Sequence, residues 1–231
     1  MGMITERCPT GISGFDRICQ GGFVRNSDNL IIGGPGSGKT TFMLQFLYNG
    51  ATQFDENGLY CSFESDILDI IQDGFSYGWD FARLNEMDKV KFLKFSPQTS
   101  ISDLKSEITK LISKYNIRRI CIDPLAVLSL NINDDAKIRE QLYELTSLMK
   151  RLRVTTILAD EVIEDPLNKQ GIMRSEIVKF LADSVTTFYP TGGGSFDRSV
   201  KIIKMRRTNH VRGAVGMTIN ESGINVVLDK F

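Results

Sequence analysis

Short apolar runs alternate with segments of helical periodicity over most of the chain. The apolar runs have the length of buried strands. They lie at Asn29–Ile32, Leu59–Phe63, Val90–Phe95, Arg119–Ile122, Thr155–Ala159 and Val185–Tyr189. Apolar strands separated by helices are typical of a parallel sheet that is covered on both faces. The pattern therefore predicts an α/β fold.

Two of the segments between these runs have a clear helical period. In Asp103–Tyr115 and Ala136–Leu152, apolar residues recur at steps of three and four, which places them on one buried helix face. After Tyr189 the glycine-rich Thr191–Asp197 precedes runs rich in Val, Ile and Thr, which predicts antiparallel hairpins. No linker divides the chain. We expect one domain over residues 1–231, with a mainly parallel central sheet, flanking helices and antiparallel C-terminal hairpins.

The overall charge narrows the classes of function. With 28 Lys and Arg against 28 Asp and Glu, the formal net charge is zero, which gives no global reason to bind nucleic acid or an anionic membrane. Hydrophobic residues make up 42% of the chain, enough to bury a core. No apolar run has the length of a membrane span, and the first residues lack the features of a signal peptide. We expect a cytoplasmic protein with no membrane partner.

The cysteines agree with a reducing compartment. None of Cys8, Cys19, Cys61 and Cys121 forms a CxxC pair. Cys61 and Cys121 lie inside apolar runs, so we interpret them as core thiols. A disulfide or a zinc site is the weaker alternative, because one histidine and scattered thiols do not make the usual four-ligand set.

The strongest chemical signal is Gly33–Thr40, which reads GGPGSGKT and fits the phosphate-binding motif GxxxxGK[ST]. It follows a predicted strand and runs into a helix-compatible segment, as the motif requires. Glycines let the backbone N–H groups wrap a phosphate at a helix N-terminus. Lys39 then supplies a charge to the β- and γ-phosphates, and the Thr40 hydroxyl becomes a Mg²⁺ ligand. A chance glycine-rich turn is the alternative.

Carboxylates at the ends of other predicted strands complete this candidate site. Asp123 follows the apolar run ICI and is placed to serve Mg²⁺, although a turn or helix-capping aspartate is the alternative. Glu64 ends another strand and is placed to orient the attacking water, although a solvated glutamate at a helix start is the alternative. Asp160 and Glu161 form a second strand-end pair, which we rank below Glu64.

A basic stretch runs from Arg198 to Arg212, with six cations and no acid. In the predicted strand VKIIKMRR, alternation places Lys204 and Arg206 on one face, with His210 just beyond. Two cations on one face suit a polyphosphate. An edge strand kept soluble by its charges is the alternative, and composition alone slightly favours it.

Taken together, these motifs resemble the single-domain ATPases related to KaiC, which belong to the RecA-like superfamily with RadA and RecA. The resemblance rests on the P-loop, on Glu64 in LYCSFES, and on the segments FSYGWD, RRICID and KMRRTNH. It runs from Thr10–Gly22 to the closing ESGINVV. The KxRxxxH pattern makes it specific, whereas the P-loop alone is generic.

The resemblance implies a RecA-like core and a homohexameric ring with ATP and Mg²⁺ between neighbouring copies. Position by position, it implies that the phosphates are wrapped by Gly36, Ser37, Gly38, Lys39, Thr40 and Thr41. It implies that Glu64 activates water and that Ser76 contacts the nucleotide. A strip that reaches the ATP of the adjacent copy comprises Lys204, Met205, Arg206, Thr208 and His210, with Lys204 and Arg206 as fingers. Asn220 and Glu221 match residues near the base or ribose.

Three departures from the family pattern bear on turnover. Ser65 stands where many relatives have a second glutamate, and Arg207 replaces the usual glycine after the finger arginine. The segment before the first strand reads GGFVRNSDN where the family has a GGIPxG-like segment. These departures leave open a slow or absent turnover with binding retained. One P-loop gives no basis for clock function or autokinase activity.

The primary hypothesis is thus a Mg-dependent ATPase that acts as a nucleotide-dependent oligomer. One alternative is a nucleotide-gated regulatory or scaffold module that binds an unknown protein partner with little hydrolysis. A DNA-binding recombinase paralogue is the less favoured alternative, because the loop Glu164–Ser175 is locally neutral and offers few phosphate contacts.

Overall fold

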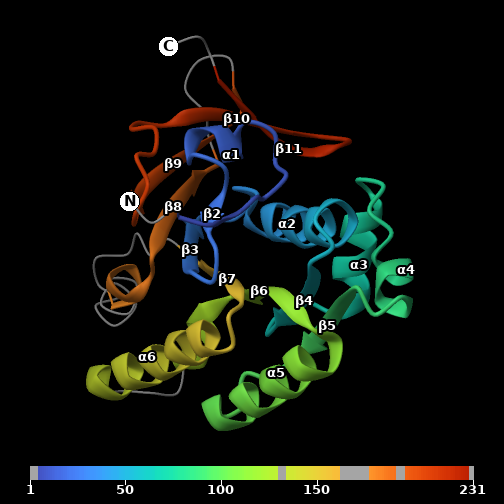
Figure 1. Ribbon diagram of the computed structural model, residues 1–231, viewed down its shortest axis with the longest axis vertical. Helices are drawn as coiled ribbons and strands as arrows, with labels where there is room; N and C mark the ends of the chain where they lie inside the picture. The colour runs from blue at the N-terminus through green and yellow to red at the C-terminus, as the bar shows by residue number, and fades with distance from the viewer. Residues whose placement is uncertain (1–4, 130–133, 162–176, 191–195, 229–231) are drawn as a thin grey trace.

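The structure is a computed structural model, and it describes residues 5–129, 134–161, 177–190 and 196–228. Within these residues nine strands form one sheet in the order β11-β10-β9-β8-β3-β7-β6-β4-β5 (Figure 1). The strands are β3 (Asp28–Gly33), β4 (Asn57–Ser62), β5 (Val90–Lys94), β6 (Ile117–Asp123), β7 (Thr155–Asp160), β8 (Ser184–Tyr189), β9 (Arg198–Met205), β10 (Val215–Asn220) and β11 (Gly223–Val227). A separate two-stranded ribbon pairs β1 (Arg7–Cys8) with β2 (Phe23–Val24).

Six strands, from β8 to β5 in the sheet order, are parallel. Their carboxyl ends therefore meet at one edge of the sheet, which is where α/β proteins place ligands. The helices are α1 (Phe15–Ile18), α2 (Lys39–Gln53), α3 (Ile67–Phe75), α4 (Phe81–Glu86), α5 (Ile101–Tyr115) and α6 (Asp135–Arg151), with a 3-10 helix η1 (Leu125–Ser129). Residues 177–181 are also helical.

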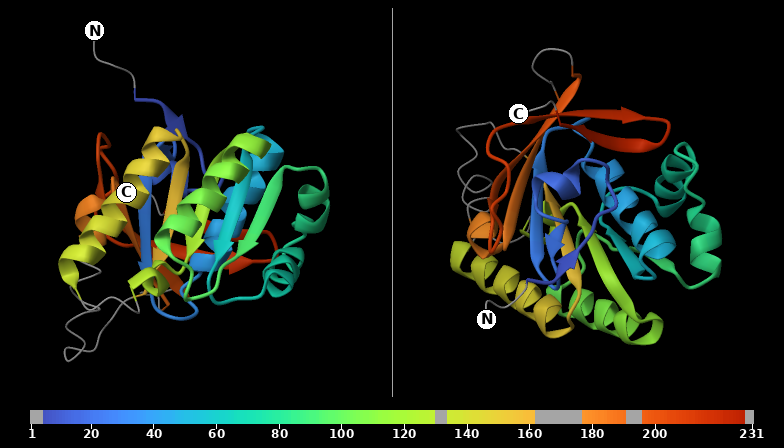
Figure 2. Two further views of the ribbon diagram at one scale, coloured as in Figure 1. Left: turned by 90° about the horizontal axis from the view of Figure 1, so that it is seen from below. Right: turned by 45° about the horizontal axis from the view of Figure 1, so that its top comes forward.

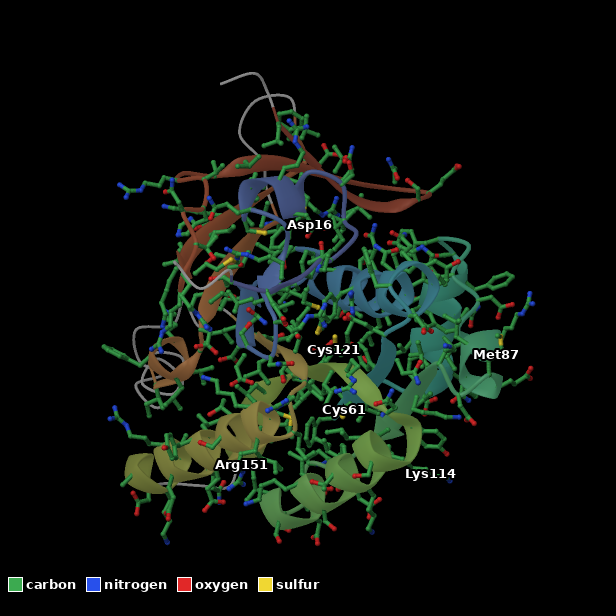
Figure 3. All side chains as sticks on the ribbon, in the orientation of Figure 1. Asp16, Cys61, Met87, Lys114, Cys121 and Arg151 are labelled. Carbon is green, nitrogen blue, oxygen red and sulfur yellow. The ribbon has the colours of Figure 1, made fainter. Side chains whose placement is uncertain are left out.

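The helices cover the two faces of the sheet separately. Helix α2 lies on one face, and α5 and α6 lie side by side on the other (Figures 1 and 2). Phe42 and Phe46 of α2 belong to the hydrophobic cluster on the first face, whereas Leu104 and Leu145 belong to the cluster on the second. Cys121 and Cys61 fall in these two clusters respectively, and Figure 3 shows both deep in the interior.

The antiparallel part of the sheet consists of β9, β10 and β11 beyond β8. The hairpin β10–β11 folds back over the face that carries α2 (Figure 2). Gln45 of α2 fixes it there, because its side chain accepts the N–H of Ile224 at 2.7 Å and donates to the carbonyl of Ile224 at 3.3 Å. The C-terminal end of the fold is thereby tied to the helix that follows the P-loop.

The structure confirms the predicted α/β fold with a mainly parallel sheet and antiparallel C-terminal strands. Each predicted strand and both predicted helices are present, with bounds that agree to within two residues. The four cysteines are free and buried, and burial raises the pKa of the Cys8 thiol to about 11. In the described part of the chain, no helix is both long and apolar enough to cross a membrane.

One predicted bound was wrong. The strand expected to continue through Arg207 ends at Met205, which pairs with Ser184, the first residue of β8. Arg207 has φ 57°, so the chain turns out of the strand there. The loop Glu164–Ser175, which motivated the recombinase hypothesis, lies outside the described residues.

Candidate functional site

A cavity of about 410 Å³ opens at the carboxyl edge of the parallel strands. It is lined by the P-loop, by residues at or just beyond the ends of three other strands, by Tyr77 after α3, and by one residue each of β9 and β10. The lining residues are Gly34, Pro35, Gly36, Ser37, Gly38, Lys39, Thr40, Thr41, Glu64, Ser65, Tyr77, Asp123, Pro124, Glu161, Arg198 and Ile219. The cavity thus joins the phosphate motif to the strand-end carboxylates.

The P-loop has the backbone that its glycines allow. Gly36 and Gly38 have φ 70° and 99°, which side-chain-bearing residues rarely adopt. A Cβ on Gly38 would lie 2.9 Å from the Ile219 side chain, whereas the space beside Gly36 is open. The Ser37 hydroxyl is buried and has no hydrogen-bond partner in the described structure. This loop therefore has polar groups and room for a phosphate beside it.

Lys39 opens α2 and folds back over the loop. Its Nζ donates to the carbonyl of Gly33 at 2.6 Å and to the carbonyl of Gly34 at 3.2 Å. A charged ammonium gains more from anionic oxygens than from neutral carbonyls. Phosphate oxygens would therefore compete well for this cation.

Thr40 and Asp123 form the candidate metal site. The Thr40 hydroxyl donates to Asp123 Oδ2 at 3.2 Å, and the Tyr60 hydroxyl donates to the same oxygen at 2.6 Å. Burial raises the pKa of Asp123, although these two bonds and the charge of Lys39 oppose the shift. No group of three or more His, Cys, Asp or Glu in the described chain is arranged to hold a metal unaided. A hydroxyl and a carboxylate fit Mg²⁺, which usually completes its shell with phosphate oxygens and water.

Glu64 directly follows Phe63, the residue after β4, and lines the cavity. Burial raises its pKa, and the negative charges of Glu161 and Asp123 raise it further. A carboxylate that holds a proton more readily is a better base toward water. Glu161 lines the same cavity. Asp160 is buried in β7 and accepts the N–H of Glu161 at 3.0 Å.

Lys204 and Arg206 lie at the opposite, amino edge of the sheet. Met205 pairs with Ser184, and Phe188 pairs with Gly33 beside the P-loop. At about 3.3 Å per residue the stretch from Ser184 to Phe188 spans roughly 13 Å. The finger candidates of a chain are therefore set apart from its own P-loop.

Both cations are held in place at that edge. Lys204 Nζ donates to the carbonyl of Lys179 at 3.0 Å, and burial lowers its pKa, with the nearby Arg206 adding to the shift. The backbone N–H of Arg206 donates to the carbonyl of Asp183 at 2.9 Å. The Arg206 guanidinium lies 3.7 Å from the Asp183 carboxylate.

The other residues of the predicted strip follow the same turn. Met205 is buried, and His210 Nδ1 lies 2.9 Å from the carbonyl of Val211. Arg7 of β1 braces the turn, donating to the Thr208 hydroxyl at 2.7 Å and to the carbonyl of Arg207 at 3.1 Å. The strip is therefore ordered by contacts within one chain.

The remaining predicted contacts are not in the cavity lining. Ser76 is exposed and donates to the carbonyl of Asp73 at 2.6 Å, while the next residue, Tyr77, lines the cavity. Asn220 and Glu221 lie where β10 ends, next to the lining residue Ile219, and Asn220 Oδ1 accepts the N–H of Ser222. Their nucleotide roles stay predictions.

Sequence reasoning missed Arg198 and Tyr77 as lining residues. Arg198 Nε donates to the carbonyl of Gly36 at 3.0 Å. Its place in the basic stretch of the sequence gives no sign of this contact. Because β9 is antiparallel to β8, its first residue returns to the P-loop while its last residues reach the other edge.

A strand, a GxxxxGK[ST] loop, a helix and strand-end carboxylates around one cavity define a P-loop nucleotide-binding protein with a RecA-like fold. Residues 8–230 match the family described as "ATPase: KaiC", and the chain belongs to that family.

Known relatives agree with this assignment. The circadian clock oscillator protein KaiC of Parasynechococcus marenigrum (strain WH8102) is 33% identical over 97% of this chain and 45% of its own length. The protein of the same name from Synechococcus elongatus is 34% identical over 94% of this chain and 43% of its own. The chain thus spans a little under half the length of these relatives.

Among solved structures, the KaiC-like protein PH0186 from the hyperthermophilic archaeon Pyrococcus horikoshii OT3 matches with a TM-score of 0.84 and 31% identity. That match covers 97% of this chain and 100% of the other. The similarity therefore extends over the whole of a KaiC-like chain as well as over part of the longer relatives.

Proposed function

We propose that this chain is a single cytoplasmic ATPase domain that hydrolyses Mg-ATP at the P-loop cavity. In this proposal it works in a head-to-tail ring, most simply a hexamer, in which Lys204 and Arg206 of one copy reach the nucleotide of the next. The observation that carries the proposal is the division of the site. The P-loop, Thr40, Asp123 and Glu64 share one cavity, while the two finger cations lie at the opposite edge of the sheet.

Each residue has a role that its surroundings support. Backbone N–H groups of Gly36–Thr41 and the ammonium of Lys39 bind phosphate oxygens. Thr40 and Asp123 hold Mg²⁺, which when bound supplies charge neutralisation at the phosphates. Glu64 orients a water and accepts its proton as the water oxygen bonds to the γ-phosphorus and ADP departs with the bridging oxygen. Cations from the adjacent copy would stabilise the charge on the transferring group.

A mixing experiment tests the division of the site. Lys39→Ala and Arg206→Ala proteins are each expected to be nearly inactive in phosphate release. Mixed in equal amounts and allowed to exchange copies, they should recover activity, because an intact P-loop from one then meets an intact finger from the other. Random mixing gives an intact pair at roughly a quarter of the interfaces.

Arg212→Ala is the matched control, since Arg212 is an exposed cation of the same basic stretch. It should retain near wild-type activity. Mixtures that stay as inactive as their components, although light scattering shows mixed oligomers, would refute the trans arrangement. An absence of phosphate release by oligomeric wild type that binds ATP would refute hydrolysis.

Ser65 favours a second candidate function, a nucleotide-gated binding module. In this function bound ATP organises a ring or docking surface, and hydrolysis is not required. Ser65 lines the cavity but has no carboxylate, so only Glu64 occupies that strand end. Under this alternative, Glu64→Gln keeps ATP-dependent assembly and partner binding, whereas Lys39→Ala loses both. A Glu64→Gln protein that fails to assemble with ATP would count against it.

A further inference from the structure

The candidate finger Arg206 shares a carboxylate with Lys150, a lysine in the last turn of α6. The Arg206 guanidinium lies 3.7 Å from Asp183 Oδ1, which is too long for a hydrogen bond. Lys150 Nζ lies 2.9 Å from the other oxygen, Asp183 Oδ2. The side chain of Asp183 is 8% exposed, whereas that of Arg206 is 55% exposed. The lysine therefore engages the carboxylate, and the guanidinium stays open to the surroundings.

The backbone around this carboxylate is fixed. Asp183 Oδ2 also accepts the backbone N–H of Asp28 at 3.1 Å. The backbone N–H of Asp183 donates to the carbonyl of Asp28 at 2.8 Å, and the carbonyl of Asp183 accepts the N–H of Arg206 at 2.9 Å. These bonds hold the Asp183 carboxylate and the Arg206 backbone in place. Which cation pairs with Asp183 therefore depends on the side chains of the two cations.

Two cations thus compete for one nearly buried charge. A rotation of the long Arg206 side chain would close the gap to Asp183 and form a direct, charge-assisted hydrogen bond. In the proposed ring the same guanidinium has to reach the nucleotide of the next copy. A guanidinium that is bonded to Asp183 is lost to that nucleotide. Because Lys150 already neutralises Asp183, the remaining attraction between this carboxylate and Arg206 is weak.

We infer that Lys150 is a positioning residue, which keeps Arg206 available to the adjacent nucleotide by occupying the carboxylate of Asp183. The inference rests on the proposed function and deepens it, since it names the groups that control the finger within its own chain. Lys150 itself makes no contact with the nucleotide in this arrangement. The chemical step is unchanged, and Lys150 sets only the fraction of the time in which Arg206 is free.

Asp28 is a second carboxylate within reach of the same lysine. Its side chain is 0% exposed, and its Oδ2 lies 3.7 Å from Lys150 Nζ. The groups that face it are Lys150 from α6, Asp183 from the segment before β8 and the Thr156 hydroxyl of β7. Burial raises the pKa of Asp28 to about 7. Once ionised, Asp28 would draw Lys150 away from Asp183, which would leave Asp183 free to bind Arg206.

Steady-state phosphate release by matched variants tests the inference. Lys150→Met should lower kcat roughly 10- to 100-fold, the range expected when a hydrogen bond between charged groups holds Arg206. The KM for ATP should change little, because the finger acts on the transition state. Asp183→Asn should keep near wild-type kcat, since its amide oxygen still accepts the N–H of Asp28 but carries no charge that captures Arg206. Lys137→Met changes another exposed lysine of α6 and, as the control, should behave like wild type.

The double variant Lys150→Met/Asp183→Asn gives the decisive result. It should recover most of the activity that Lys150→Met loses, because no carboxylate then captures the finger. A merely structural role of Lys150 gives no reason for a second substitution to restore activity. A double variant as inactive as Lys150→Met would overturn the inference alone. The same holds for a Lys150→Met protein with wild-type kcat, or for an Asp183→Asn protein as inactive as Arg206→Ala.

Other outcomes concern the proposed function. An Arg206→Ala protein as active as wild type would overturn the finger in trans, and the inference with it. A wild type that binds ATP and releases no phosphate would overturn hydrolysis, and the inference would fall too. These results are read from wild type and Arg206→Ala, so they are separate from those of the Lys150 and Asp183 variants.

A pH profile that leaves Lys150 in place guards against a Lys150→Met protein that fails to fold. As pH rises through about 7 and Asp28 ionises, Lys150 divides its charge between two carboxylates. The ratio of wild-type kcat to Asp28→Asn kcat should therefore fall over this range. The ratio cancels the titration of groups that the two proteins share, Glu64 among them. A ratio that is constant or rises with pH would contradict the inference.

Discussion

A buried ion pair beneath α2 leads to a large and measurable prediction. The side chain of Arg119 is 0% exposed and that of Glu56 is 11% exposed, and Arg119 Nε donates to Glu56 Oε2 at 2.7 Å. Arg119 also donates to the carbonyl of Phe46 at 2.9 Å and lies 4.5 Å from the centre of the Phe46 ring. Arg25 pairs with the other oxygen of Glu56.

The perturbation is Glu56→Gln, which keeps the shape but leaves Arg119 buried without a counter-charge. Removing one partner of a buried pair costs about 3–5 kcal/mol. Because the amide oxygen of glutamine still accepts one hydrogen bond, we expect a loss of about 3 kcal/mol in the free energy of unfolding. For a domain of this size that corresponds to a fall in Tm of roughly 6–12 °C.

The assay is urea unfolding followed by circular dichroism at a fixed protein concentration, with the m-value expected to stay unchanged. Glu6→Gln is the matched control, because Glu6 is 79% exposed and lies 4.0 Å from Arg25. It should cost less than about 0.5 kcal/mol. If Glu56→Gln cost no more than this control, the argument that the pair stabilises the fold would be refuted.

The effect also has a defined pH dependence. Burial acts to raise the pKa of Glu56, but the charge of Arg119 and the hydrogen bonds from Arg25 and Arg119 outweigh it and hold the pKa below its ordinary value. A depressed folded-state pKa adds stability that is present above the unfolded-state pKa and is lost as pH falls through the folded-state value. The unfolding curves of wild type and Glu56→Gln should therefore converge at acid pH.

Three further predictions follow from other sites. Arg207→Gly should raise the free energy of unfolding by about 0.5–1 kcal/mol in urea unfolding. The reason is that a non-glycine residue at φ 57° carries left-handed strain, and relief of this strain exceeds the cost of the added chain entropy of glycine. Arg207→Ala keeps the strain and should show no gain. Burial raises the pKa of Asp28 from 3.8 to about 7, so the folded state binds this proton more tightly and wild-type stability should fall as pH rises from about 4 to 7, by at most roughly 4 kcal/mol. Asp28→Asn should flatten that slope in pH-resolved thermal unfolding, and an unchanged slope would exclude Asp28 as its source. Asp123→Asn should raise the Mg²⁺ concentration for half-maximal phosphate release at least about tenfold, measured by Mg²⁺ titration at saturating ATP. As the control, the variant should bind tripolyphosphate in EDTA with the same affinity as wild type.

The sheet was predictable because its strands are buried on both faces and read as continuous apolar runs. The P-loop was predictable because its chemistry depends on adjacent residues. Arg119 shows where such reasoning stops. It begins an apolar run, and nothing local reveals that Glu56, which lies far from it in sequence, neutralises it.

The candidate site shows the same limit. Its strand-end acids follow from chain order, since parallel strands end at one edge. Arg198 reaches the cavity because β9 runs antiparallel to β8 and returns to the P-loop. Tyr77 stacks on Trp79, whose ring packs against Gly223 of β11, so its place also depends on a long-range contact. The end of β9 at Met205 depends on where its partner β8 begins.

Strand β9 has an unusual position under the proposed trans arrangement. Its first residue, Arg198, touches the P-loop of its own copy, and Arg206, just past its last residue, serves the next copy. Strand β9, with eight residues of extended chain and a length of roughly 25 Å, would then connect each nucleotide site to that of the neighbouring copy. A two-fold dimer brings identical surfaces together, so Arg206 of one copy would not meet the P-loop of the other. In a closed ring the β9 strands would connect every nucleotide site to the next one. A displacement of β9 at one site would therefore reach the adjacent site before any other.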